Sequence, residues 1–166
     1  NPMCKVPRTL MLFVDGLGLG PEDPGINPVF RGCAPALGAL LRNHAVPVDA
    51  RLGVDGRPQS ATGQTSLLTG ANAARRMGRH VEGFPGPPLQ RLVRERNLLR
   101  PLVERGYTAT FANAYYLDER AASRLRRRRS VTTVAALDAF GGVREASAML
   151  EGRAVYQDLT RRGLRA

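Results

Sequence analysis

Short apolar runs alternate with stretches of helical spacing along the first two thirds of the chain, and this alternation constrains the fold most. The runs that predict strands cover residues 9–14, 46–54 and 107–112. A helix is expected over residues 34–41, and apolar residues recur at helical spacing again over 89–103. Strands that alternate with helices predict a layered α/β domain with a mainly parallel sheet.

The first expected strand delivers its last residue into a glycine-rich loop. The sequence there continues Asp15-Gly-Leu-Gly-Leu-Gly-Pro. A carboxylate at the end of a rigid strand, beside residues without side chains, suits the ligation of a hard or borderline cation. The alternative interpretation is that Asp15 caps a turn through its own side chain. A dinucleotide-binding fingerprint is disfavoured because Pro21 stands where its third glycine would be.

A second candidate segment contains many hydroxyl groups and the expected start of a helix. Residues 59–70 read QSATGQTSLLTG, and we expect a helix to begin near residues 60–62 and to stop at Gly70. A hydroxyl at a helix N-terminus lies in a positive potential beside free backbone amides, which favours an alkoxide and a bound phosphoryl group. Ser60 is therefore a candidate nucleophile, and capping of the helix by Ser60 or Thr62 is the alternative interpretation.

Together these two segments resemble the alkaline phosphatase superfamily. Sulfatases of that superfamily carry their nucleophile ten residues before the glycine of a Leu-Leu-Thr-Gly ending, and counting back from Gly70 gives Ser60. Phosphopentomutases and cofactor-independent phosphoglycerate mutases place a glycine three residues after the nucleophile, and Gly63 holds that position here. The segments GRHVEGFP at 78–85 and TFANAY at 110–115 are similar to metalloenzymes related to those mutases.

The resemblance implies an α/β fold of the three-layer sandwich type and a metal-dependent phosphatase or phosphomutase. Two divalent metal ions are expected, either zinc, manganese or magnesium. Asp15 would ligate one metal, and Ser60 would attack the phosphorus of a small phosphate ester while it is held against that same metal. Ser60 would thereby become transiently phosphorylated.

Four further side chains are candidate substrate ligands: Arg57, Arg79, His80 and Asn113. The two arginines would clamp a second phosphate or a carboxylate of the substrate, or would only form a solvated basic face. His80 would face a substrate phosphate, or would be an ordinary loop residue. Asn113 follows the third expected strand, where it would reach the carboxyl edge of the sheet or only close a turn.

The second half of the family's metal site has no counterpart in this sequence. The family completes that site with segments of the Asp-x-x-x-His and Asp-His-Gly kind, whereas the chain contains only His44 and His80. We therefore expect a single α/β domain or the N-terminal part of one, with core strands and nucleophile loop in 1–115 and a basic helical segment in 116–166. A non-catalytic remnant or fragment of that fold is the alternative.

The chain is strongly basic, with a formal net charge of +11, and Lys5 is the only lysine among its 25 basic residues. An anion-binding protein would use arginine in this way, and a GC-rich coding sequence would produce the same bias. The run RLRRRR at 124–129 suggests a nucleic-acid-binding protein. No aromatic residue is interleaved there for base stacking, so nucleic acid is not the expected partner.

The sequence predicts no attachment to a membrane. No apolar run approaches the roughly 20 residues of a spanning helix, and none has the length of a secretory signal. We therefore expect a cytoplasmic protein. The two cysteines, Cys4 and Cys33, form no CxxC pair, which argues against a disulfide framework or a cysteine zinc site.

Overall fold

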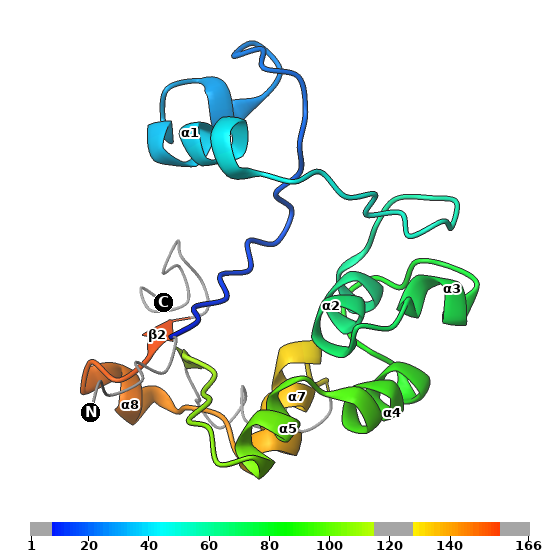
Figure 1. Ribbon diagram of the computed structural model, residues 1–166, viewed down its shortest axis with the longest axis vertical. Helices are drawn as coiled ribbons and strands as arrows, with labels where there is room; N and C mark the ends of the chain where they lie inside the picture. Colours follow the sequence, from blue (N-terminus) through cyan, green and yellow to red (C-terminus); the bar gives the residue numbers. More distant parts are fainter. Residues whose placement is uncertain (1–7, 115–127, 157–166) are drawn as a thin grey trace, which may run out of the picture. The chain divides into compact units, whose positions relative to one another are not determined.

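The computed structural model describes residues 8–114 and 128–156 of the chain, which divides into two compact units (Figure 1). The first unit comprises Asn1–Val48 and the second comprises Asp49–Ala166. Within the described ranges no helix is both long enough and apolar enough to cross a membrane.

The first unit is built around one short turn and one helix. The turn is a 3-10 helix, Pro28–Phe30 (η1), and the helix is α1, Pro35–His44. Pro35 occupies the first turn of α1, where its missing N–H group costs no hydrogen bond. The helix expected over residues 34–41 is thereby confirmed. Among the described residues of this unit only Gly38 is buried, so the unit has no apolar core of its own.

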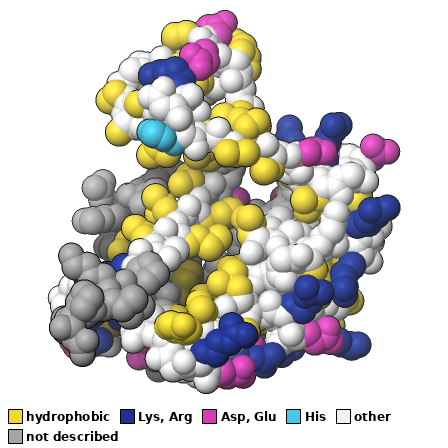
Figure 2. All heavy atoms as spheres, viewed as in Figure 1, with side chains coloured by type: hydrophobic (Ala, Val, Ile, Leu, Met, Phe, Trp, Pro, Cys, Tyr) yellow, Lys and Arg dark blue, Asp and Glu magenta, His cyan; other side chains and the backbone are white. Residues whose placement is uncertain are grey.

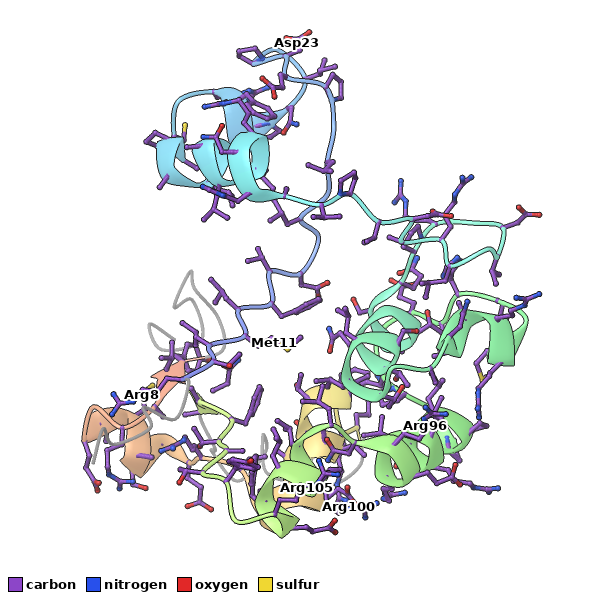
Figure 3. All side chains as sticks on the ribbon, in the orientation of Figure 1. Arg8, Met11, Asp23, Arg96, Arg100 and Arg105 are labelled. Carbon is purple, nitrogen blue, oxygen red and sulfur yellow. The ribbon has the colours of Figure 1, made fainter. Side chains whose placement is uncertain are left out.

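Residues 9–14, expected as the first strand, form an extended segment that is not part of any sheet in the described structure. Its side chains are exposed, from 41% for Val14 to 87% for Leu10, and apolar side chains accordingly reach the surface (Figure 2). Met11 projects from the same segment (Figure 3). A strand needs a neighbouring chain to complete its backbone hydrogen bonds. The strand prediction is wrong here because the described residues supply no such neighbour.

The second expected strand, at residues 46–54, is also absent from the structure. The chain turns at residues 50–53, where φ is +56° at Leu52 and +70° at Gly53. Two consecutive left-handed residues are incompatible with the extended geometry of a strand. The prediction failed because valines at both ends of the segment gave it β character while its middle forms a turn.

The second unit is largely helical. Within its described residues the helices are α2 (Ser60–Thr69), α3 (Ala73–Met77), α4 (Pro87–Arg96), α5 (Leu99–Glu104), α7 (Val131–Phe140) and α8 (Ala146–Leu150). The helical spacing over 89–103 corresponds to α4 and α5, and α7 and α8 lie in the segment 116–166 that was expected to be helical. The basic run at 124–129 lies outside the described residues except for its last two positions.

Two apolar clusters form the core, and both involve α2 and α4. One cluster joins α2, α3 and the loop before α3 to α4 through Ala61, Ala71, Ala73, Leu89 and Leu92. The other joins α2 and α4 to α7 through Leu68, Val93, Val131, Val134 and Ala135. The apolar residues of α4 recur three and four positions apart, which places them on the one face that this core covers.

The sheet of the described structure has two short parallel strands, β1 (Asn113–Ala114) and β2 (Val155–Tyr156), in the register Asn113 to Val155. The third strand was expected at 107–112 and in fact begins at Asn113. Arg144 holds the region together by donating to the Phe111 carbonyl at 3.2 Å and to the Arg153 carbonyl at 2.7 Å. The fold is therefore a mixture of helices with a small parallel sheet, which is compatible with the α/β class.

Candidate functional site

Ser60 is the first residue of α2. The preceding residue, Gln59, is the N-cap, with φ −131° and ψ 151°, and its side chain makes no capping hydrogen bond. Neither Ser60 nor Thr62 occupies the cap position, so the alternative interpretation of these hydroxyls as N-caps is wrong. The helix ends as expected at Gly70, where φ is +65° and the amide donates to the Ser66 carbonyl.

Hydrogen bonds connect the start of α2 to the segment that follows α3. The amide of Ala61 donates to the Val81 carbonyl at 3.1 Å, and the amide of Val81 donates back to the Thr62 hydroxyl at 3.3 Å. The Thr62 hydroxyl in turn donates to the Gln59 carbonyl at 3.2 Å. These bonds bring the backbone of residues 79–81, and with it two of the candidate residues, Arg79 and His80, next to the helix start.

The hydroxyl-bearing residues of α2 differ in how exposed they are. Thr62 and Thr65 are completely buried, whereas Ser60 is only half-buried. Ser66 donates to the Thr62 carbonyl at 2.8 Å and accepts from the amide of Ala73 at 3.0 Å, so its hydroxyl links α2 to α3. Of Ser60, Thr62 and Thr65, Ser60 is therefore the residue that is partly exposed.

The loop that leads into Ser60 is held in place by two side chains distant in sequence. The ring Nε2 of His80 lies 3.2 Å from the Val54 carbonyl oxygen, and because that oxygen only accepts, Nε2 is assigned the proton. Asn72 donates its side-chain amide to the Leu52 carbonyl at 2.7 Å. Gly56, with φ +106°, passes beside the His80 ring, where an added Cβ would lie 3.7 Å from Cδ2.

The same loop begins with a local hydrogen bond that stabilises a carboxylate. The amide of Arg51 donates to Asp49 Oδ1 at 3.0 Å. This backbone hydrogen bond, helped by the nearby guanidinium, lowers the pKa of Asp49 below its usual range. Asp49 therefore stays ionised, and its turn intact, to a lower pH than a free aspartate would.

The candidate substrate ligands fall into two groups. Arg57 and Arg79 are exposed, lie on the two segments beside the start of α2, and form no ion pair within the described residues. His80 is half-buried, and one of its ring nitrogens is engaged with Val54. Asn113 instead belongs to β1, and no hydrogen bond within the described ranges links its side chain to α2.

Asp15 lies in the first unit and Ser60 in the second. Asp15 is exposed in a turn with Gly16, whose φ is +74°. The described residues hold no group of three or more His, Cys, Asp or Glu side chains that could share a metal ion. Carboxylate and hydroxyl oxygens suit hard divalent cations, so the chemistry of Asp15 and Ser60 fits the metals that the resemblance implies.

Sequence reasoning missed Asn72. Its side chain has two functions, because its amide nitrogen holds the Leu52 carbonyl and its oxygen accepts from the amide of Arg75 at 2.8 Å to cap α3. An asparagine two residues after Gly70 and just before an alanine pair was the available signal for the cap. The long-range contact to Leu52 left no signal in the sequence.

No protein-family model, no curated protein and no solved structure matches this chain.

Proposed function

We propose that this chain takes part in metal-dependent phosphoryl transfer, with Ser60 as the nucleophile and Asp15 as a metal ligand. The observation that carries the proposal is the exposure pattern of α2. Of the hydroxyls near its N-terminus, Thr62 and Thr65 are buried, and the half-buried one is Ser60, the residue that the two spacings of the alkaline phosphatase superfamily select.

The position of Ser60 suits the chemistry. The first residue of a ten-residue helix lies at the positive end of the helix dipole, which favours negative charge on its oxygen and on a bound phosphoryl group. Two divalent ions, when bound, would lower the pKa of the hydroxyl and neutralise charge on the phosphoryl group. The Ser60 hydroxyl loses its proton to solvent and its oxygen forms a bond to phosphorus, the bond from phosphorus to the ester oxygen breaks, and the departing alkoxide takes a proton from solvent to leave as the alcohol.

The other candidate residues have separate roles in this proposal. Arg57 and Arg79 bind a second anionic group of a small phosphorylated substrate, since both are exposed and lack ion-pair partners among the described residues. His80 fixes the loop before Ser60 through Val54. Asn113 is retained as a ligand at the sheet edge. The fold that we propose is the three-layer sandwich with a mainly parallel sheet.

The proposal is tested by metal content and by labelling of Ser60. The purified chain is exchanged into buffer with manganese or zinc, freed of unbound ion, and measured by elemental analysis. It is then incubated with p-nitrophenyl phosphate, and intact-mass and peptide mass spectrometry locate any phosphoserine. We expect bound metal that is lost in Asp15→Ala, and a phosphoryl group on Ser60 that is lost in Ser60→Ala.

A matched control is Ser147→Ala, which removes an exposed serine from the first turn of another helix, α8. This variant should retain both metal and label. Phosphorylation that persists in Ser60→Ala contradicts the assignment of the nucleophile. A wild-type chain with neither metal nor label supports the alternative, a non-catalytic remnant or fragment of the fold.

A further inference from the structure

The surface formed by α3, α4 and the loop between them is rich in exposed arginine. Residues 73–96 contain six arginines and two glutamates. All six arginines are exposed, and none forms an ion pair within the described part of the chain: Arg75, Arg76, Arg79, Arg91, Arg94 and Arg96. Figure 2 shows basic side chains gathered along the side of the second unit that carries these helices, and Arg96 is labelled on α4 in Figure 3. We call this region the arginine surface.

Two of these arginines, one from each helix, line a common hollow. Its volume is about 210 Å³, and Arg76 of α3 and Arg91 of α4 both contribute to its wall. The lining also includes the apolar residues Met77 and Pro88, and among the described residues Glu95 is the acidic one that lines it. A hollow with two guanidinium groups and an apolar lining suits a ligand that combines negative charge with a flat apolar part.

An exposed aromatic residue lies on the loop between the two helices. Phe84 is 48% exposed, and it is the only exposed large apolar side chain in residues 73–96. The loop is fixed at its end, because Pro85 is buried and its carbonyl accepts from the side-chain amide of Gln90 at 2.9 Å. An aromatic ring held at the surface of a basic region is the usual platform on which an unpaired base stacks.

We propose that the arginine surface binds single-stranded nucleic acid. Guanidinium groups with no acidic partner among the described residues bind successive phosphates, and Phe84 stacks on a base. An acidic membrane is the less favoured partner because it would require a broad exposed apolar face, whereas Leu89 and Leu92 are 1% and 5% exposed. The run at 124–129 lacks an aromatic residue, but this surface has one. The proposal does not depend on the phosphoryl-transfer chemistry of Ser60.

The test is fluorescence anisotropy of a labelled oligothymidylate of about 16 nucleotides, titrated with the full chain from about 50 to about 200 mM salt. Binding should weaken with salt. The double variant Arg76→Gln/Arg91→Gln should raise the dissociation constant about tenfold or more and reduce the steepness of the logarithmic salt dependence by about 1.4, because each lost phosphate contact on a single strand removes about 0.7.

A matched control separates the arginine surface from net charge. The double variant Arg8→Gln/Arg105→Gln removes the same charge from two exposed arginines outside the surface. This control should leave the salt dependence nearly unchanged. If both double variants weaken binding equally, the chain attracts the strand only through its overall charge of +11, and the proposal is wrong.

Substitutions at Phe84 distinguish stacking from insertion into lipid. Phe84→Ala and Phe84→Leu should each weaken binding about fivefold or more, whereas Phe84→Tyr should retain it, because a leucine is apolar but cannot stack. Circular dichroism of each variant checks that the fold is kept. Tighter binding to phosphatidylserine vesicles than to the strand, with Phe84→Leu fully active, would identify a membrane as the partner. Absence of binding to either probe also rejects the proposal.

Discussion

Among the buried residues, the hydroxyl group of Thr65 is the clearest source of lost stability. Its oxygen is completely buried, and it has no hydrogen-bond partner in the described structure. One turn further along, the Thr69 hydroxyl donates to the Thr65 carbonyl at 2.7 Å and accepts from the amide of Ala71 at 3.2 Å. On α2, the Thr69 hydroxyl therefore both donates and accepts a hydrogen bond, whereas the Thr65 hydroxyl makes none in the described structure.

This pair gives a direct test at the residue scale. Thr65→Val keeps the shape and removes an unused polar atom, so we expect the free energy of unfolding to rise by about 1 kcal/mol. Thr69→Val removes two hydrogen bonds and leaves the Ala71 amide without its acceptor, so the free energy should fall by about 1–3 kcal/mol. Urea denaturation followed by circular dichroism measures both. Destabilisation by Thr65→Val would show that its hydroxyl has a partner.

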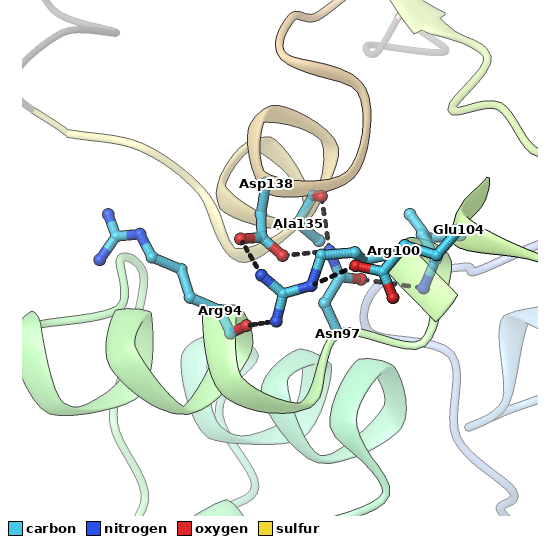
Figure 4. A network of polar contacts seen from close by, with 7 residues as sticks. Arg94, Asn97, Arg100, Glu104, Ala135 and Asp138 are labelled. Atoms are coloured by element: carbon cyan, nitrogen blue, oxygen red, sulfur yellow. Dashed lines mark hydrogen bonds and ion pairs between the residues drawn. The ribbon is translucent and has the colours of Figure 1, made fainter. Parts of the chain in front are cut away.

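At the scale of elements, a buried polar network joins the junction of α4 and α5 to α7 (Figure 4). Asn97, 1% exposed, donates to the Ala135 carbonyl at 2.7 Å and to the Asp138 carboxylate at 3.1 Å, and its oxygen accepts from the amide of Leu99. Arg100 donates to the other oxygen of Asp138 at 3.1 Å. Both polar side-chain atoms of Asn97 are thus hydrogen-bonded, and these contacts connect the junction of α4 and α5 to α7.

Replacing the side-chain amide of Asn97, which donates hydrogen bonds, by a second carboxylate tests this network. Asn97→Asp would place an acceptor against the Ala135 carbonyl and the Asp138 carboxylate, so we expect a loss of about 3 kcal/mol or more at neutral pH. Burial and the like charge raise the pKa of the introduced carboxyl, so the loss should shrink as the pH falls and the group is protonated. Urea unfolding at pH 7 and at pH 5 measures the difference. Asn43→Asp, on the exposed part of α1, is the matched control and should change little.

Most of the longer helices could be predicted from the sequence, and the strands mostly could not. Helix α4 repeats its apolar residues over a local window, and Gly70 and Gly141 end their helices with the left-handed φ that glycine tolerates. The apolar run at 9–14 has β character, but strand formation depends on a partner elsewhere in the chain. Local periodicity does not encode that partner.

Only the part of the candidate site that depends on residues close together in the sequence could be predicted. The helix start near Ser60 followed from the hydroxyl-bearing residues there, and its end followed from Gly70. The contact of Asn72 with Leu52 spans 20 residues and that of His80 with Val54 spans 26, so neither leaves a periodic pattern. The sequence left His80 either facing a substrate phosphate or as an ordinary loop residue. Its Nε2 contacts the backbone of the loop, and its contact with a substrate stays a prediction.

At the scale of the whole molecule, the buried apolar residues are concentrated in one unit. Every buried hydrophobic side chain of the described structure lies in the second unit, from Ala61 onwards. We therefore expect the amides of α2, α4 and α7 to exchange with solvent slowly and together, and those of α1 to exchange much faster. Hydrogen exchange read by mass spectrometry tests this. Equal protection of α1 and α4 would contradict it and would mean that α1 is buried in solution.

The exposed segment at 9–14 also has a consequence for how the protein behaves in the test tube. Five consecutive apolar residues, Leu10 to Val14, carry no charge and no proline, which is the composition of segments that stack into intermolecular β-structure. The excess of arginine opposes this, because molecules with a charge of +11 repel one another. Added salt screens that repulsion. Concentrated solutions should therefore have the lowest turbidity at low ionic strength, and their turbidity should rise as salt is added.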